Sequence, residues 1–249
     1  EGGRATTLID GAIAVLEPGT GPRRLVPVED VPVTIAGIST PNVQNAMAAA
    51  SAGLGIGLPE RAVVRGLRSF LPEPERNPGR ANLFRCDRRV VVVDYAHNEA
   101  GMAGLTELCR GLCPPGSEVW VAFCTAGDRT DRILHRFAYR AARGADHVVI
   151  AELHRYLRGR DPADLVERLR AGALEGGATE VPVFPDEVRA LRWMLRASRP
   201  GDVVAITALG QRPEIFRMLA RRGAEGLSPA AVRRLAGRVR QQVGRGGRG

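Results

Sequence analysis

The sequence contains no lysine, because all 36 of its basic residues are arginine. A nucleotide-binding P-loop of the GxxxxGK[ST] type uses its lysine to reach the β- and γ-phosphates, so this chain holds no such P-loop. Schiff-base catalysis is excluded for the same reason, since it requires a lysine amine.

Cysteines and aromatic residues are also scarce. The four cysteines, at 86, 109, 113 and 124, form no CxxC and no zinc-binding pattern, so we expect buried, reduced thiols of the kind found in cytoplasmic proteins. Aromatic residues make up 4% of the chain against 44% hydrophobic residues, which predicts an aliphatic core. No apolar run approaches the roughly 20 residues of a membrane span. We therefore expect a cytoplasmic protein with no membrane partner.

The net charge of +9 is unevenly distributed. Residues 221–249 hold eight Arg and one Glu, a net of +7, which leaves +2 for the other 220 residues. We expect this Arg-rich tail to be a solvated helix followed by a disordered Gly/Arg end, with no specific nucleic-acid partner. Adventitious binding to polyanions is the alternative.

Residues 90–105 are the segment around which the rest of the chain can be organised. Four consecutive valines at 90–93 predict a buried strand that is covered on both faces. A polar run, Asp94-Tyr95-Ala96-His97-Asn98, separates this strand from an amphipathic helix. This order places Asp94 and His97 at the carboxyl edge of a sheet, where open α/β sheets bind ligands. The alternative is a capped turn whose side chains only satisfy backbone groups.

Strands and helices alternate from residue 90 onward. We expect strands at 90–94, 118–123, 146–151, 181–184 and 202–207, and helices at 99–112, 131–143, 161–172 and 186–197. Such alternation predicts an α/β fold with a doubly wound, mainly parallel sheet.

The first 71 residues have a different pattern. Strand-like segments at 7–17, 25–28 and 31–35 predict an antiparallel meander. An Ala-rich helix over 42–54 follows, with Asn42 and Asn45 on one face, and a second helix begins after Pro59. Helix capping or a surface amide explains the two asparagines as well as a ligand role does. The Pro-rich stretch 72–79 indicates a linker.

Two more polar loops follow predicted strands. In the first, residues 124–131, Asp128 could cap a helix and Arg129 could bind an anion. The second, residues 152–160, contains Arg158 and Arg160. Because both loops leave the same sheet edge as Asp94, we expect all three to converge on one ligand.

Four segments carry a resemblance to a known family. PNVQNAMAAA, NPGRANLF, VVVDYAHNEAGM and AGDRTDRIL, in this order and spacing, resemble the Mur ligase superfamily of ATP-dependent, amide-forming ligases. The GDR-x-D and RGR loops are most similar to its cyanophycin synthetase branch. The resemblance covers about residues 1–220. It implies the end of a central ATP-binding domain (1–71), a linker (72–79) and a carboxyl-terminal domain (80–220) with a Rossmann-like sheet, and it leaves out the Arg-rich tail (221–249).

The resemblance also implies residue roles. Asn42 and Asn45 match a helix near the adenine, although the histidine of that family motif is Pro41 here. Arg80 matches the arginine that approaches the nucleotide phosphates, and Asp94 matches the aspartate that reaches the ribose. His97 and Asn98 line the same crevice. The loops that face the incoming amino acid correspond to Asp128, Arg129, Asp131, Arg158 and Arg160.

The implied reaction forms an acyl phosphate from a carboxylate and ATP with Mg²⁺, and an amine then attacks it. The leading hypothesis is synthesis of cyanophycin, an Asp/Arg polymer. The alternatives are addition of an amino acid to a peptidoglycan precursor or a polyglutamate tail, and a non-catalytic nucleotide-binding module. In this family the P-loop and most Mg²⁺ ligands lie upstream of the matching segments. We therefore assign no catalytic residue or metal ligand here, and expect this chain to be inactive alone.

We expect activity to require an upstream P-loop segment, supplied by the same polypeptide or by a partner. The chain would then be one part of a longer ligase, as its start at Glu1 also suggests. ATP and an amino acid are the expected ligands, and we expect a homo-oligomer.

Overall fold

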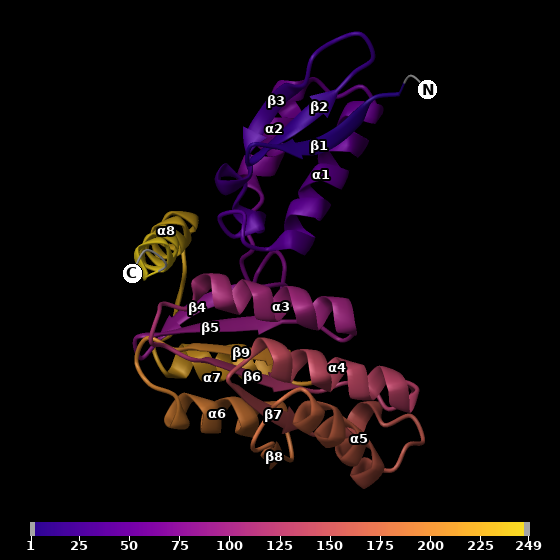
Figure 1. The fold of residues 1–249 in the computed structure, drawn as a ribbon, viewed down its shortest axis with the longest axis vertical. Helices are drawn as coiled ribbons and strands as arrows, with labels where there is room; N and C mark the ends of the chain where they lie inside the picture. The colour runs from indigo at the N-terminus through magenta and orange to yellow at the C-terminus, as the bar shows by residue number, and fades with distance from the viewer. Residues whose placement is uncertain (1–2, 247–249) are drawn as a thin grey trace. The chain divides into compact units, whose positions relative to one another are not determined.

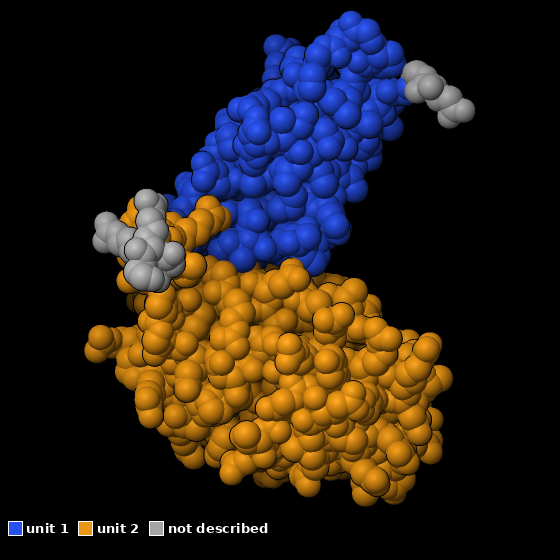
Figure 2. Space-filling model, viewed as in Figure 1, with its two compact units in different colours: residues 1–72, 228–236 blue, residues 73–227, 237–249 orange. Residues whose placement is uncertain are grey.

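A computed structural model describes residues 3–246, and the chain divides into two compact units (Figures 1 and 2). Unit 1 comprises the chain up to Pro72 together with Ser228–Ala236. Unit 2 comprises Glu73–Leu227 and the chain from Gly237 onward.

Unit 1 is a small antiparallel sheet with two helices. Its strands, β1 (Ala5–Ile9), β2 (Ala12–Leu16) and β3 (Arg23–Pro27), lie in the order β1-β2-β3. The helices α1 (Thr40–Gly55) and α2 (Glu60–Ser69) enclose its aliphatic core, which includes Ile13, Ala50 and Leu67. The two helices therefore agree with the sequence prediction to within a few residues.

Two strand predictions in this unit were wrong. The segment 7–17 is two strands, because Asp10 and Gly11 take positive φ values of 45° and 71° and turn the chain back. The segment 31–35 contains no strand and instead holds η2 (Pro32–Thr34), which follows η1 (Val28–Asp30). Pro32 has no N–H to donate to a strand ladder, and the Thr34 hydroxyl donates to the Val31 carbonyl at 2.8 Å.

Unit 2 is built on one mixed sheet. Its order is β10-β4-β5-β9-β6-β7-β8. The five strands from β5 to β8 in that order are parallel, and at one edge β4 pairs antiparallel with both β5 and β10. The strand bounds are β4 Asn82–Cys86, β5 Arg89–Asp94, β6 Val119–Phe123, β7 His147–Ala151, β8 Val183–Phe184, β9 Val203–Thr207 and β10 Glu225–Gly226. The mainly parallel sheet predicted from the sequence is confirmed.

Helices cover both faces of this sheet (Figure 1). On one face, α6 (Glu187–Ala197) and α7 (Arg212–Arg221) pack their apolar residues against the odd-numbered valines of β5 and against β6, β7 and β9. On the other, α3 (Glu99–Leu112) and α4 (Asp131–Gly144) contact the sheet, and α5 (Pro162–Glu175) packs on α4. A strand covered on both faces needs apolar residues throughout, which explains the valine run of β5.

The Arg-rich segment differs from its prediction. Residues 225–226 form β10, which pairs with β4, and α8 (Pro229–Gly246) has a buried face that includes Val232, Leu235 and Val239. This helix is therefore packed rather than solvated all round. The predicted disordered end falls partly on residues 247–249, which lie outside the described residues.

Two composition-based predictions can also be compared with the structure. All four cysteines are buried and free of disulfides, as predicted. Among residues 3–246, no helix is long and apolar enough to cross a membrane.

Candidate functional site

The carboxyl ends of four neighbouring strands meet at one edge of the unit 2 sheet. The chain runs from β5 through α3 to β6, and β9 later inserts between these two strands. The loops that follow β5, β9, β6 and β7 therefore leave the same edge side by side. Open α/β sheets bind their ligands at the point where the strand order changes direction. In this sheet that point lies between β5 and β6.

Asp94 ends β5 at this edge. Its half-buried carboxylate accepts the Ala81 N–H at 2.8 Å, and Ala81 is held at a φ of 51°, in the left-handed region. Burial raises the pKa of the Asp94 carboxyl above its ordinary value. The N–H groups of Ala81 and Ala96 and the charge of Arg80 oppose this rise in pKa, because they stabilise the ionised form.

Arg80 lies next to Asp94 on the turn that precedes β4. Its guanidinium carbon is 4.9 Å from the centroid of the Tyr95 ring, a cation–π contact, and the side chain is otherwise exposed. The Tyr95 ring is in turn 5.4 Å from the His97 ring. The structure thus brings together three of the predicted nucleotide-site residues, Arg80, Asp94 and His97.

His97 and Asn98 make backbone contacts within the turn. His97 Nδ1 lies 3.0 Å from the Tyr95 carbonyl oxygen. Asn98 is the N-cap of α3, and its Oδ1 accepts the Gly101 N–H at 2.8 Å. The interpretation as a capped turn accounts for Asn98, whereas Nε2 of His97 has no hydrogen-bond partner within residues 3–246.

Asn42 and Asn45 belong to unit 1. Both lie on the first turns of α1, with Asn42 half-buried and Asn45 exposed, and Asn45 Nδ2 donates to Asn42 Oδ1 at 3.4 Å. They share one helix face, as the spacing predicts. Their role near an adenine stays a prediction.

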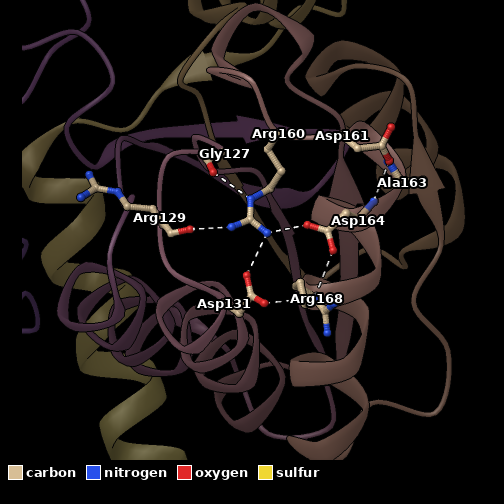
Figure 3. Close-up of polar contacts among 8 residues, drawn as sticks. All are labelled: Gly127, Arg129, Asp131, Arg160, Asp161, Ala163, Asp164 and Arg168. Carbon is tan, nitrogen blue, oxygen red and sulfur yellow. Dashed lines mark hydrogen bonds and ion pairs between the residues drawn. The ribbon is translucent and has the colours of Figure 1, made fainter.

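Arg160 is the centre of an ion-pair cluster that joins the loops after β6 and β7 to α5 (Figure 3). Its guanidinium donates to the Gly127 and Arg129 carbonyls at 2.8 and 2.9 Å. It also pairs with Asp131 at 2.9 Å and with Asp164. These acids raise the pKa of Arg160, and Arg160 lowers the pKa of the Asp164 carboxyl. Only 19% of the Arg160 side chain is exposed.

The remaining residues of this loop pair are more open. Arg158 pairs with Asp128 at the surface. The Arg129 side chain points away from the cluster in Figure 3, and it has no ion pair or side-chain hydrogen bond within the described part of the chain. Gly127 allows the two loops to meet, because a Cβ there would lie 2.2 Å from the Leu157 carbonyl oxygen. The predicted substrate residues therefore converge, with four of the five paired to one another or to their neighbours.

Sequence reasoning missed two parts of the site. Asp164 and Arg168 extend the cluster along α5, with Arg168 3.2 Å from Asp164 and 3.5 Å from Asp131. The spacing of Arg160, Asp164 and Arg168, four residues apart each time, could have indicated this row on the sequence.

The second missed residue is Glu187, at the start of α6. It is fully buried, and its carboxylate accepts the N–H groups of Leu209, Gly210 and Gln211, which form the loop after β9. The Cys124 thiol, on the loop after β6, donates to the same carboxylate at 3.1 Å. An acid at the start of a helix is an ordinary sequence feature, so only the fold reveals this role.

The edge therefore has two halves with different chemistry. Around Asp94, an exposed arginine and a half-buried carboxylate can meet a phosphate and a hydroxyl. Around Arg160, acids and arginines neutralise each other. No group of three or more His, Cys, Asp or Glu side chains that could hold a metal ion is present among residues 3–246.

Comparison with known families matches residues 79–210 to the one described as "Mur ligase, glutamate ligase domain". A cyanophycin synthetase from Geminocystis herdmanii is 29% identical over 205 residues, which are 82% of this chain and 23% of that protein. A UDP-N-acetylmuramoyl-L-alanyl-D-glutamate–2,6-diaminopimelate ligase from Alkalilimnicola ehrlichii is 31% identical over 205 residues, covering 81% of this chain and 39% of that protein.

The fold also matches solved structures. A bifunctional folylpolyglutamate synthase/dihydrofolate synthase from Yersinia pestis, complexed with AMPPNP and a Mn ion, has a TM-score of 0.58 and 19% sequence identity. The match covers 87% of this chain and 45% of that chain. Compared with the cyanophycin synthetase, this chain spans about a quarter of the relative's length.

Proposed function

Because this chain belongs to the Mur ligase family, we propose that it is part of an ATP-dependent amino-acid ligase that forms amide bonds through an acyl phosphate. The polymer of Asp and Arg called cyanophycin is the product we favour. The observation that carries the proposal is the grouping of Arg80, Asp94 and His97 at the carboxyl edge of the sheet, within the matched domain.

The nucleotide half of the edge suits this chemistry. A guanidinium offers a planar fork of N–H donors that can bind two phosphate oxygens, and Arg80 stacks on the Tyr95 ring without an ion pair or side-chain hydrogen bond to any of residues 3–246. The Asp94 carboxylate can accept hydrogen bonds from vicinal ribose hydroxyls, as acidic residues do in other nucleotide sites. Positioning and cationic stabilisation are the main demands of phosphoryl transfer.

The residues that would complete ATP binding are not all in this chain. Without lysine there is no P-loop, so we expect no ATP hydrolysis by residues 1–249 alone. The solved relative with AMPPNP and a Mn ion supports ATP and a divalent metal as cofactors. Since the described residues offer no metal cluster, Mg²⁺ would be held by the phosphates and by ligands from an upstream P-loop segment. The location in the cytoplasm and a homo-oligomeric state remain predictions.

For the amino acid, we propose the loop pair of Asp128, Arg129, Asp131, Arg158 and Arg160. The guanidinium of Arg129, which has no ion pair among residues 3–246, can bind the substrate carboxylate. An arginine substrate could then exchange its own guanidinium for that of Arg158 at the exposed Asp128, with Asp131 the second candidate. Such an exchange keeps the number of ion pairs constant, so it requires no uncompensated charge.

The decisive experiment uses the full-length gene product. We expect ATP-dependent incorporation of radiolabelled Asp and Arg into an acid-insoluble polymer. Arg80→Gln and Asp94→Asn should raise the KM for ATP, Asp128→Asn and Asp131→Asn should raise the KM for the amino acid, and Glu167→Gln, an exposed acid on α5, should change neither. If both Asp variants leave the amino-acid KM unchanged, the loop assignment is wrong.

The second candidate is a ligase that adds an amino acid to a peptidoglycan precursor, and the 31% identity to the diaminopimelate ligase favours it over addition to a polyglutamate tail. Activity on a UDP-linked peptide without polymer formation would select this candidate. Nucleotide binding without turnover on any of these substrates would select the non-catalytic module.

A further inference from the structure

A cavity of about 480 Å³ opens between α6 and α7 in unit 2. It belongs to the side of the sheet opposite α3 and α4, and it uses none of the residues assigned above to the nucleotide or the amino acid. Its volume lies within the roughly 300–1,000 Å³ of small-molecule sites. It is lined by Asp186, Val188, Arg189, Arg192, Gln211, Glu214, Arg217, Met218, Arg221 and Arg222.

The walls of this cavity are strongly cationic. Five arginines and two acids line it, which gives a net charge of 5 − 2 = +3. Three of the arginines are paired: Arg189 with Asp186 at 3.4 Å, Arg217 with Glu214 at 2.5 Å, and Arg222 with Asp87 at 3.1 Å. Asp87 lies outside the lining, so counting it leaves an excess of +2, which the remaining two arginines supply.

Arg192 and Arg221 are those two arginines. Both are exposed, and neither has an ion pair or side-chain hydrogen bond with any residue in the described range 3–246. Arg192 is on α6 and Arg221 is at the end of α7, so the two walls of the cavity each present one unpaired guanidinium. Neither guanidinium contributes an ion pair to the fold within residues 3–246, so stability does not explain their place in the lining.

The floor of the cavity is apolar and linked to the sheet. Met218 is buried and Val188 is half-buried, and the Val188 N–H donates to the Gln211 side chain at 3.2 Å. Gln211 belongs to the loop that Glu187 fixes after β9. These contacts fix the loop after β9 and the start of α6, so a ligand has to order the arginine side chains but not this backbone.

We propose that this cavity binds a small ligand with two or more neighbouring anionic groups, carboxylates or phosphates. A guanidinium binds either group through two parallel N–H···O bonds, and two of them on facing walls match two anionic groups on one molecule. A ligand with a single anionic group could meet only one wall. The proposal does not depend on the ligase function, because it uses none of the residues assigned to the nucleotide or the amino acid.

The test measures binding to the 249-residue chain by isothermal titration calorimetry at low salt. The probes are tripolyphosphate, tricarballylate and triaspartate, with inorganic phosphate and acetate as single-charge comparisons. The variants are Arg192→Gln/Arg221→Gln and the control Arg196→Gln/Arg132→Gln. The control removes the same charge from two exposed arginines of α6 and α4 that lie outside the cavity.

We expect a multivalent probe to bind with 1:1 stoichiometry and the cavity double variant to weaken its Kd by about 100-fold, or about tenfold for each guanidinium lost. The control variant should weaken it by less than about threefold. Preference for tripolyphosphate would identify a phosphate ligand, and preference for the carboxylate probes an acidic metabolite or peptide. Equal weakening by both double variants, or no preference for multivalent over single-charge probes, would overturn the proposal.

Discussion

The carboxylate of Glu187 should be one of the strongest stabilising groups in unit 2, and Glu187→Gln tests this. The glutamine has the same shape, but one oxygen becomes an amino group that cannot accept a hydrogen bond. In the native site the two oxygens accept three backbone N–H groups, with distances such as 2.6 Å from Leu209 and 3.0 Å from Gly210. The substitution therefore leaves at least one buried N–H facing another donor.

The expected cost follows from these contacts. A hydrogen bond to a charged group contributes about 1.5–3 kcal/mol, and a buried N–H left without an acceptor costs a similar amount. Glu187→Gln should thus lower the free energy of unfolding of unit 2 by about 3 kcal/mol. For a unit of this size, that corresponds to a fall in Tm of roughly 6–12 °C.

The chain offers a convenient probe for this measurement. Its two tryptophans, Trp120 on β6 and Trp193 on α6, both belong to unit 2, so tryptophan fluorescence during urea unfolding reports this unit alone. The matched control is Glu167→Gln, which should change the unfolding free energy by less than about 0.5 kcal/mol. If Glu187→Gln unfolds at the same urea concentration as the control, the carboxylate does not hold the loop after β9.

Three further predictions use the same unfolding assay. Asn98→Ala should destabilise unit 2 by about 1 kcal/mol, because it removes the N-cap that accepts the Gly101 N–H. Gly127→Ala should cost about 1–3 kcal/mol, because the new Cβ would lie 2.2 Å from the Leu157 carbonyl oxygen. It should also speed amide exchange at residue 127, whose N–H donates to the Tyr156 carbonyl at 3.0 Å, and unchanged exchange would contradict this. Asp94→Asn should stabilise unit 2 at pH 7, since burial raises the pKa of Asp94 in the folded state and its ionisation then opposes folding. That gain in unfolding free energy should shrink as the pH falls toward about 3.9, the pKa of Asp in the unfolded chain, because Asp94 then becomes protonated in both the folded and the unfolded protein. A gain that grows on acidification would contradict this prediction.

Much of unit 2 could be predicted from the sequence because its signals are local. The valine run of β5 and the alternation of apolar strands with amphipathic helices predict the parallel strands and helices between 90 and 207. In unit 1 the same approach failed at 31–35, where apolar residues resemble a strand but Pro32 and the Thr34 hydroxyl favour a 3₁₀ turn. Local hydrogen bonding there prevailed over β-propensity.

Features that depend on strand order could not be predicted. Nothing local indicates that β9 lies between β5 and β6, and that insertion brings the loop held by Glu187 to the edge that carries Asp94. Long-range charge pairing was equally hidden. The sequence marks Asp131 and Arg160 as polar loop residues, but only the tertiary placement of the loops shows that they bind each other.

The two halves of the edge differ in how many of their charged side chains already form ion pairs. We therefore expect them to bind ligands at different cost. Around Asp94, Arg80 makes a cation–π contact and has no ion pair or side-chain hydrogen bond in the described part of the chain, so a phosphate can bind it at little cost. Around Arg160, every acid of the cluster has a partner, so a cationic amino acid must replace an existing ion pair. A replacement of this kind favours a ligand with the geometry of the displaced group. If the loop assignment is correct, selectivity for a guanidinium over an ammonium substrate should depend on Asp128 and Asp131, whereas the affinity for ATP should not.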